Sequence, residues 1–344
     1  MKGLGFREHG GLERVEFVDI PEPSAGPGEV RVRVRAAAFN RLDRFVLAGI
    51  PGVPIERPHV LGSDVAGEVD SLGPGVSDLP VGSRVLANPG IWDGTCESCR
   101  SGQESLCRAF RILGEHTQGS ATEYVVLPRR NLYAIPPAWS FADAAAVPLV
   151  FQTAWRAIRT IGATRPGDLV AVIGAGGGVA SAAVQVAKLL GARVAVTTRD
   201  DRKAERARSL GADEVLVTSP DRPIDRGLWE WSGKRGVDVV FDSSGRDTVP
   251  RSLKAIARGG RVVVIGATTG PLVELDLRTL FWRQASIRGS TMANSREFEE
   301  VLAELAAGRL RPVVDREYDF ADGVEAIARI DSPELFGKVV LRGP

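Results

Sequence analysis

Hydrophobic and polar residues alternate strictly at positions 30–35 (VRVRVR), near the amino terminus. This period of two is typical of a half-buried β-strand. Turn residues follow at Gly62, Gly67, 73–75 (GPG) and Gly82. Short β elements separated by glycine and proline turns predict a compact, barrel-like domain over roughly the first 150 residues.

The pattern changes near Phe141. A helical stretch runs through Trp155 and Ile161, and a loop follows at 162–168. Beyond the loop, short apolar runs alternate with amphipathic segments, which predicts a parallel sheet covered by helices on both faces. The predicted strands are Leu169 to Ile173, Arg193 to Thr197, Glu214 to Val217, Val237 to Asp242 and Arg261 to Ile265.

Two further elements are predicted toward the carboxyl end. Residues 294–297 (NSRE) have the pattern of a capping box, and a helix with one apolar face follows them. Residues 336–341 (FGKVVL) predict a closing strand. The sequence contains no internal repeat.

Length and charge narrow the possible functions. The 344 residues are enough for two domains with separate cores. A formal net charge of +1, without long runs of like charge, argues against nucleic acid or an anionic membrane as the main partner. The amino terminus has no signal-peptide core, and the apolar stretch 142–157 is too short to span a bilayer. These features predict a cytoplasmic protein.

A glycine-rich turn, 174–180 (GAGGGVA), joins the first strand of the predicted parallel sheet to a helix. Residues without bulky side chains let the backbone approach a pyrophosphate, and the helix amino terminus presents free N–H groups to it. The turn therefore predicts a dinucleotide site, with Ala180 in place of the usual last glycine. The predicted ligands are Gly176, Gly177, Gly178 and Val179.

The end of the second strand bears on the choice of coenzyme. An NAD site usually places an acidic residue there, whereas this chain has Thr198 and Arg199, with Lys203 nearby. A hydroxyl and a guanidinium suit a 2′-phosphate, which a carboxylate would repel. The sequence thus favours NADP(H). Alternatively, Asp200 or Asp201 turns inward, or the basic residues are solvated surface charges.

All three cysteines are clustered, at Cys96, Cys99 and Cys107, and Asp93 precedes them. The pattern Asp-x2-Cys-x2-Cys-x7-Cys fits a tetrahedral structural zinc site, and three thiolates favour zinc over magnesium or calcium. The opposing interpretation is three unmetallated thiols. Alternatives to Asp93 as the fourth ligand are Glu97, Glu104 and water.

These features resemble the medium-chain dehydrogenase/reductase superfamily, whose best-known branch is zinc-dependent alcohol dehydrogenase. The resemblance covers essentially the whole chain. It implies a GroES-like β-rich catalytic domain at 1–148 and 289–344, a Rossmann domain at 149–288, and a dimer or tetramer. Its markers are the cysteine lobe, the glycine turn, 58–67 (PHVLGSDVAG), 241–245 (FDSSG), 264–267 (VIGA) and 337–340 (GKVV).

The catalytic zinc of that branch is not expected here. Where the branch has its metal ligands, this chain has Asn40, Ser63 with Asp64, and Leu149. Leucine cannot bind zinc, and amides and hydroxyls are poor ligands.

Without a metal, hydrogen-bond donors must stabilise the oxygen that gains charge during hydride transfer. By analogy with the family, Asn40 and Ser63 are the candidate donors, and His59 or Asp43 the candidate proton relay. The alternatives are that Asn40 and Ser63 only cap turns, and that His59 binds a metal together with Asp43 or Asp64.

The resemblance also suggests residues around the coenzyme. Lys338 is expected near the pyrophosphate. Core packing is the alternative for Ile265 and Met292. The residues expected around the nicotinamide are Thr153, Ser243, Ile265, Ala267, Ser290 and Met292.

Three functions follow from the sequence. The leading hypothesis is an NADP(H)-dependent, alcohol dehydrogenase-like enzyme that interconverts a small ketone or aldehyde and an alcohol. The second is an NADPH-dependent enone or quinone reductase, because conjugate hydride addition demands less carbonyl polarisation. The third is a non-catalytic NADP(H)-binding protein.

Overall fold

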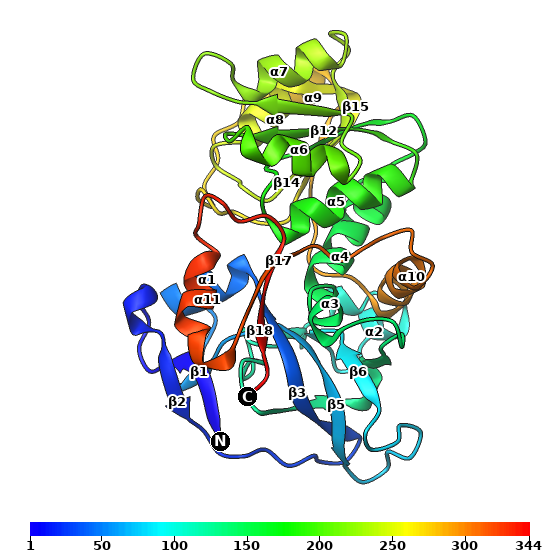
Figure 1. The fold of residues 1–344 in the computed structure, drawn as a ribbon. Coiled ribbons are helices and arrows are strands. Elements are labelled where there is room, and N and C mark those ends of the chain that lie inside the picture. Colours follow the sequence, from blue (N-terminus) through cyan, green and yellow to red (C-terminus); the bar gives the residue numbers. More distant parts are fainter. The chain divides into compact units, whose positions relative to one another are not determined.

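The computed structural model describes residues 1–344, which form two compact units (Figure 1). The first unit comprises Met1–Leu149, Asn294–Phe298 and Pro312–Pro344, and the second comprises Val150–Ala293 and Glu299–Arg311. The chain therefore returns to the first unit at Asn294, later than the predicted boundary at 288, and enters the second unit again before its carboxyl-terminal segment.

Helix α10 (Ser295–Ala306) explains this second crossing. Its capping box forms as predicted, because the Asn294 N–H donates to Glu297 Oε2 (2.9 Å) and the Glu297 N–H donates to Asn294 Oδ1 (2.7 Å). One turn later, Glu300 Oε2 accepts a hydrogen bond from Trp155 Nε1 (3.1 Å). That contact attaches the rest of α10 to the second unit.

Antiparallel strands form most of the first unit. Its seven-stranded sheet has the order β10-β6-β5-β3-β18-β17, with β9 also paired to β3, and two smaller sheets are β2-β1-β4 and β7-β8. The strands are β1 (Lys2–Phe6), β2 (Glu16–Asp19), β3 (Glu29–Phe39), β4 (His59–Val60), β5 (Asp64–Leu72), β6 (Arg84–Ala87), β7 (Gly90–Ile91), β8 (Arg111–Ile112), β9 (Tyr124–Pro128), β10 (Leu132–Ala134), β17 (Val314–Tyr318) and β18 (Lys338–Arg342).

Strand β3 is longer than the alternation at 30–35 predicts. It continues through Ala36, Ala37 and Ala38, which are buried on both faces of the sheet and so break the period of two. The predicted closing strand is confirmed as β18, which pairs antiparallel with β3 and parallel with β17. The helices of this unit are α1 (Arg41–Ala48), α2 (Glu97–Arg100), α3 (Phe141–Ala145) and α11 (Gly323–Arg329).

The second unit contains a six-stranded parallel sheet in the order β13-β12-β11-β14-β15-β16. The strands are β11 (Leu169–Val172), β12 (Arg193–Thr198), β13 (Glu214–Val217), β14 (Val237–Asp242), β15 (Ile256–Val264) and β16 (Ser286–Gly289). Five of them were predicted from apolar runs. The sixth, β16, has the sequence SIRG and lacks such a run, because it lies at the sheet edge and is not deeply buried.

Helices connect these parallel strands. They are α4 (Pro148–Trp155), which continues as a π-helical stretch over Arg156–Ile161, α5 (Gly178–Leu189), α6 (Arg202–Ser209), α7 (Ile224–Trp231), α8 (Val249–Ala255) and α9 (Leu277–Trp282). No helix of the chain is both long and apolar enough to cross a membrane. The carboxyl ends of parallel strands meet at one sheet edge, so the loops that begin at Gly174, Arg199, Ser243, Ile265 and Ser290 share that edge.

Candidate functional site

The glycine turn between β11 and α5 forms an anion cradle. Gly174 has φ +90°, and its N–H donates to Thr197 Oγ1 (3.0 Å), which fixes the start of the turn. Gly177 is the residue before α5 and provides no side-chain cap. A Cβ at Gly174 or Gly177 would meet no atom within 4 Å, so the space beside the backbone is open. Free N–H groups at the amino terminus of α5 therefore face room for a phosphate.

The residues that follow β12 differ in whether their charged side chains are paired within the protein. The Thr198 hydroxyl accepts from the Asp200 N–H (3.1 Å), and the Asp200 carboxylate forms an ion pair with Arg202 (2.9 Å). The hydrogen bond from Arg202 lowers the pKa of Asp200. Asp200 is thus neutralised by its own neighbour, while Arg199 is exposed and makes no ion pair or side-chain hydrogen bond. Arg199 is the cation that remains free for a ligand.

The loop after β14 is organised by Asp242, which the sequence interpretation did not single out. Asp242 is fully buried, and its Oδ1 accepts from Ser244 N–H (2.8 Å), Gly245 N–H (3.0 Å) and Thr248 Oγ1 (2.8 Å). Its backbone oxygen accepts from the Ile265 N–H (2.9 Å), which joins this loop to the end of β15. Its sequence signals were its position at the end of an apolar strand and its place in the marker 241–245 (FDSSG).

The residues expected around the nicotinamide have different environments. Ile265 is only half-buried, which does not fit core packing, whereas Met292 is 5% exposed and contacts Thr153 through its sulfur (Oγ1 to Sδ, 3.8 Å). The Ser290 hydroxyl is enclosed and has no hydrogen-bond partner. A buried hydroxyl without a partner is costly, so it marks a position where a ligand can bind.

In the first unit, Asp64 connects three of the positions where a zinc-dependent relative would hold its metal. Asp64 Oδ2 accepts from Asn40 Nδ2 (2.8 Å), and Asp64 Oδ1 accepts from the Leu149 N–H (2.7 Å). The third donor is the ammonium of Lys338, 2.8 Å from Oδ2. We call Asn40, Asp64 and Lys338 the polar cluster.

The ammonium of Lys338, which was predicted to lie near the pyrophosphate, binds groups of the first unit in this structure. Its ammonium donates to Phe39 O (2.8 Å), Asn40 Oδ1 (2.6 Å) and Asp64 Oδ2 (2.8 Å). An ammonium has three donors, so all of them are used inside the first unit. A role of Lys338 at the pyrophosphate stays a prediction.

The two proposed proton relays are engaged with backbone groups. Asp43 accepts from the N–H groups of Asn40 (2.7 Å) and Gly62 (2.6 Å), one at each carboxylate oxygen, and burial raises its pKa to about 6. His59 lies with Nε2 3.0 Å from Gly114 O, and burial lowers its pKa. Nε2 therefore donates this hydrogen bond, because the carbonyl can only accept.

Ser63 has no such engagement. Its hydroxyl oxygen is completely buried, and no hydrogen-bond partner reaches it. The next residue, Asp64, is held through its backbone in addition to its side chain, since Ser120 Oγ donates to Asp64 O (2.7 Å). The rigid backbone therefore presents an unsatisfied hydroxyl beside the polar cluster.

The cysteine lobe brings together the four residues that the spacing singles out. The ligand atoms of Asp93, Cys96, Cys99 and Cys107 all lie within 4.8 Å of one another. A tetrahedral zinc with Zn–S bonds of about 2.3 Å separates its ligand atoms by about 3.8 Å, so these residues fit the ion. Glu97, an alternative to Asp93, is exposed and outside the group.

Asp93 is preorganised as a ligand. Its Oδ1 accepts from the N–H groups of Thr95 (2.7 Å) and Cys96 (2.9 Å), while Oδ2 lies 3.2 Å from Cys107 Sγ. The backbone N–H of Cys96 in particular holds the pKa of Asp93 far below its usual range. Glu104, the other acidic alternative, instead accepts a hydrogen bond from Ser295 (2.6 Å).

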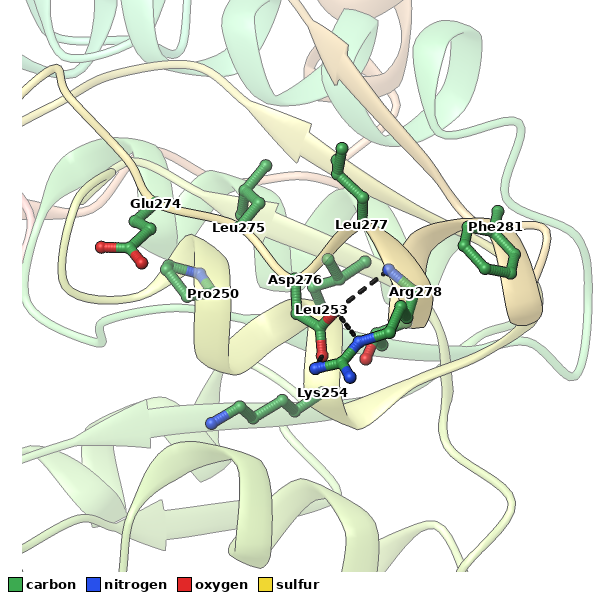
Figure 2. Close-up of a pocket in the computed structure, with 10 residues that line it drawn as sticks. Pro250, Leu253, Lys254, Glu274, Leu275, Asp276, Leu277, Arg278 and Phe281 are labelled. Atoms are coloured by element: carbon green, nitrogen blue, oxygen red, sulfur yellow. Dashed lines mark hydrogen bonds and ion pairs between the residues drawn. The ribbon is translucent and has the colours of Figure 1, made fainter.

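The cavities of the second unit lie apart from these groups. A cavity of about 670 Å³ is lined by α8 and by residues 274–281, and none of the predicted coenzyme ligands contributes to it (Figure 2). Leu277 and Phe281 border this cavity and are largely exposed.

Comparison with known proteins agrees with this architecture. Residues 26–137 match the family model of the alcohol dehydrogenase GroES-like domain, and residues 178–307 match that of the zinc-binding dehydrogenases. Acryloyl-coenzyme A reductase from Metallosphaera sedula is 32% identical over 344 residues, which cover 99% of each chain.

Two solved structures are also similar. A crystal structure of an NAD-dependent alcohol dehydrogenase is 43% identical, with a TM-score of 0.93 and coverage of 99% of both chains. A variant of the crotonyl-CoA carboxylase/reductase AntE in complex with NADP is 26% identical, with a TM-score of 0.90 over 100% of this chain and 95% of that chain.

The fold thus combines a GroES-like domain with a Rossmann-like parallel sheet. The chain belongs to the medium-chain dehydrogenase/reductase superfamily, and it is an oxidoreductase.

The cysteine lobe gives the first testable prediction. Purified protein should contain about one zinc per chain, and Cys99→Ala should remove it and lower the thermal midpoint, because the ion closes the loop. Metal analysis and a thermal melt of each variant measure both effects. Ser98→Ala, in the same helix, is the matched control and should retain metal and midpoint. If the purified wild-type protein contained no metal and Cys99→Ala had the same thermal midpoint as the wild type, the structural zinc would be contradicted.

Proposed function

We propose that this protein reduces a carbon–carbon double bond conjugated to a carbonyl or thioester, with NADP(H) as coenzyme and without a catalytic zinc. One observation carries the proposal. At the positions of the usual metal ligands, Asp64 is neutralised by the buried ammonium of Lys338, and its oxygens are filled by Asn40 and the Leu149 N–H. The hydrogen-bonding and charged atoms of these groups are paired with one another, and in this proposal they do not form a set of metal ligands.

A double bond conjugated to a carbonyl suits such a site. When a hydride adds at the β carbon, the negative charge of the resulting enolate is shared between the α carbon and the oxygen, so ordinary hydrogen bonds can stabilise it. Direct reduction of a simple ketone localises the charge on oxygen and gains more from a Lewis acid. The names of two relatives, an acryloyl-coenzyme A reductase and a crotonyl-CoA carboxylase/reductase, support the same substrate class.

In this proposal Ser63 and Asn40 stabilise the substrate oxygen. The Ser63 hydroxyl has no partner in the protein, and Asn40 Nδ2 donates one of its two N–H groups to Asp64. One hydroxyl and one amide N–H, both on buried residues, thus lack a partner in the protein and would be the donors to the substrate oxygen. A single donor of this kind contributes about 10²–10³ in kcat in other enzymes.

Asp43 and His59 take structural roles in this proposal, unlike the proton-relay role suggested by the sequence. Both oxygens of Asp43 hold backbone N–H groups, and the His59 ring donates to Gly114 O. The proton that completes the reduction then comes from water. A His59→Gln variant should therefore retain kcat, since glutamine can also donate to that carbonyl, and a tenfold loss measured in the steady state would return His59 to the mechanism.

The second unit holds the coenzyme in this proposal. The N–H groups at Gly176, Gly177, Gly178 and Val179 surround the pyrophosphate, and the open space beside Gly177 supports this role. When bound, NADPH supplies a hydride. Residues proposed around the nicotinamide remain Thr153, Ser243, Ile265, Ala267, Ser290 and Met292.

The choice of NADP(H) is supported by charge. Thr198, Arg199 and Lys203 are the proposed ligands of the 2′-phosphate, and the nearest carboxylate, Asp200, is already paired with Arg202. The carboxylate of Asp200 is therefore occupied by its own ion pair, and β12 ends in Thr198 rather than in an acidic residue. The NADP complex of the AntE relative supports the same choice.

Ketone or aldehyde reduction, reversible to the alcohol, is the second candidate. The relative named NAD-dependent alcohol dehydrogenase, which is 43% identical, favours it. A third possibility, a non-catalytic NADP(H)-binding protein, would bind the coenzyme without turnover. The cytoplasmic location stays a prediction.

We also propose a homo-oligomer. On the second unit, Leu272, Leu277, Phe281 and Trp282 are 82%, 63%, 65% and 68% exposed, respectively, in the segment that precedes the edge strand β16 in the chain. Figure 2 shows two of them, Leu277 and Phe281, at the rim of the cavity. Large apolar side chains in a patch next to a strand with an unpaired edge are typical of a face that a second copy covers.

Arg199 gives a test of the coenzyme. Arg199→Ala should raise KM for NADPH by about 10- to 100-fold, because a charge-assisted contact to the 2′-phosphate is lost, and leave KM for NADH nearly unchanged. Steady-state kinetics with both coenzymes measure the difference. Arg208→Ala, an exposed arginine of α6, is the control. An equal effect on both coenzymes, or wild-type preference for NADH, would refute the assignment.

The reaction can be tested directly. NADPH oxidation with enoyl thioesters, enones, quinones, ketones and aldehydes should be fastest with conjugated acceptors, by roughly a hundredfold over a saturated ketone of equal size. Deuterium from C4-labelled NADPH should appear at the carbon β to the carbonyl. Faster ketone reduction, or two zinc ions per chain, would favour the alcohol dehydrogenase alternative. Tight NADPH binding without turnover would favour the third possibility.

The oligomer makes a separate prediction. Light scattering of the eluting protein should give a dimer or tetramer, and Phe281→Asp should shift it toward the monomer by placing a charge in the contact. Val81, 63% exposed in the first unit, supplies the control Val81→Asp, which should leave the mass unchanged. A monomeric wild-type protein would rule the proposal out.

A further inference from the structure

A second cavity of the second unit, of about 450 Å³, combines tryptophan rings with positive charges. It lies at the amino ends of β14, β15 and β16, because most of its lining residues come just before these strands or at their start. The glycine turn and the other loops predicted to hold the coenzyme lie at the carboxyl ends, on the opposite edge of the sheet. We call this cavity the basic tryptophan pocket. Its charged and aromatic lining residues are Trp229, Lys234, Arg235, Arg258, Trp282 and Arg283.

Most of the positive charge in this pocket has no ion-pair partner. Of its four cations only Arg235 forms an ion pair, with Asp238 (2.6 Å). Lys234 is exposed, and its ammonium makes no hydrogen bond or ion pair. Arg258 and Arg283 each donate one hydrogen bond, to a backbone carbonyl oxygen. Three cations are thus gathered at one cavity without a carboxylate bound to any of them.

The two guanidinium groups without an ion pair are close enough to repel each other. Partial burial, and then the charge of Arg258, lower the pKa of Arg283. An anion between the two groups would replace this repulsion by attraction. Each guanidinium has five N–H donors and uses one of them on a carbonyl, so donors remain for a phosphate, which arginine binds in a bidentate manner.

The tryptophan rings hold these guanidinium groups at the wall of the pocket. Arg283 Cζ lies 5.2 Å from the ring centroid of Trp229, and Arg258 Cζ lies 5.9 Å from that of Trp282. Both distances are those of cation–π contacts. Trp282 is nevertheless 68% exposed, so most of its ring surface remains open for a planar ligand to stack on.

The turn that presents Lys234 is strained. Gly233 has φ +64° and Lys234 has φ +66°, a left-handed conformation that lysine rarely adopts. The Lys234 N–H donates to Trp229 O (2.8 Å), so this turn ends α7 and sets Lys234 beside the tryptophan. The Glu230 carboxylate feels the charge of Lys234, but its ion pair is with Arg226 (2.9 Å), and that hydrogen bond lowers its pKa most. Strain of this kind is often kept where a side chain serves a ligand.

Size and overall charge narrow the class of ligand. Cavities that bind small molecules have volumes of about 300–1,000 Å³, and the basic tryptophan pocket is within this range. The chain as a whole has a formal net charge of only +1, so the positive charge is local to the pocket and no broad basic surface accompanies it. A small anion with a planar ring therefore fits better than a nucleic acid.

We propose that the basic tryptophan pocket binds a nucleoside phosphate, as a site separate from the coenzyme cradle. The phosphate is held by Lys234, Arg258 and Arg283, and the base stacks on Trp282. Stacking on an aromatic side chain suits every base, because each base has a π-face. Such a group occurs both in free nucleotides and in coenzyme A. The inference does not depend on the reaction proposed above.

Isothermal titration calorimetry of the full chain tests this site. One equivalent of NADP⁺ or NAD⁺, whichever the wild type binds more tightly, first fills the coenzyme cradle. The ligands are ATP, coenzyme A, tripolyphosphate, which lacks the ring, and adenosine, which lacks the phosphate. ATP or coenzyme A should bind at one site per chain, at least about tenfold more tightly than tripolyphosphate or adenosine, because stacking and charge-assisted hydrogen bonds both contribute. The tighter of the two identifies the source of the nucleoside phosphate.

Two variants assign the binding to the pocket. Lys234→Asn removes a charge that has no partner in the protein, and asparagine tolerates the left-handed backbone. Arg258→Ala removes one of the two facing guanidinium groups. Each should weaken binding by about tenfold or more, because a charge-assisted contact is lost. Arg208→Ala, an exposed arginine of α6, is the control and should bind as the wild type does.

Two further readouts separate this site from the others. KM for NADPH should stay within about twofold of wild type in both variants, because the pocket and the coenzyme loops lie at opposite edges of the sheet. The mass from light scattering should also be unchanged. Trp282 belongs to the exposed apolar patch as well, and for this reason the variants are placed at Lys234 and Arg258, which lie outside that patch.

Several outcomes would overturn the proposal. The site fails if neither ATP nor coenzyme A binds, or if both variants bind them as tightly as the wild type does. It also fails if ATP binds only by displacing the coenzyme, because the binding then belongs to the cradle. Tripolyphosphate that binds as tightly as ATP would contradict the proposed ligand class. A single-stranded oligonucleotide that binds more than tenfold tighter than ATP would make the pocket a nucleic-acid contact instead.

Discussion

The buried ion pair between Asp64 and Lys338 connects parts of the chain that are 274 residues apart. Asp64 starts β5, Asn40 follows β3, and Lys338 starts β18, so three strands of one sheet meet at these side chains. The pair is acceptable only because every donor and acceptor in it has a partner. The position of β18 on β3 and the orientation of Asn40 both depend on that condition.

Much of the second unit could be predicted, because each of its buried strands has a recognisable pattern in its own short stretch of sequence. Buried parallel strands have apolar runs, and the glycine turn must lie between β11 and α5 for the backbone to reach a phosphate. The edge strand β16 carried no such signal, because a half-exposed strand needs no apolar run. The split of α10 between the units could not be predicted either, since it depends on the contact of Glu300 with Trp155.

The candidate site shows the same contrast between local and distant information. The cysteine lobe lies within 93–107, so spacing alone was enough to group its four residues, and the structure brings them together. The position of the Lys338 ammonium depends on strand pairing across the whole chain, and sequence reasoning assigned it to the pyrophosphate. Asp242 lies in the marker 241–245 (FDSSG), but its individual role was not predicted, because that role comes from the hydrogen bonds by which it holds the loop.

The placement of β18 also affects the order in which the site is completed during synthesis. Asn40, Ser63 and Asp64 leave the ribosome early, and the cysteine lobe follows with all of its ligands in one short segment. The whole Rossmann domain is made before Lys338 appears. Until then, β3 lacks its neighbour β18, and the Asp64 carboxylate has no cation to neutralise it. A nascent chain can thus bring the four residues of the cysteine lobe together and fold its parallel sheet before β18 pairs with β3 and gives Asp64 its counter-ion.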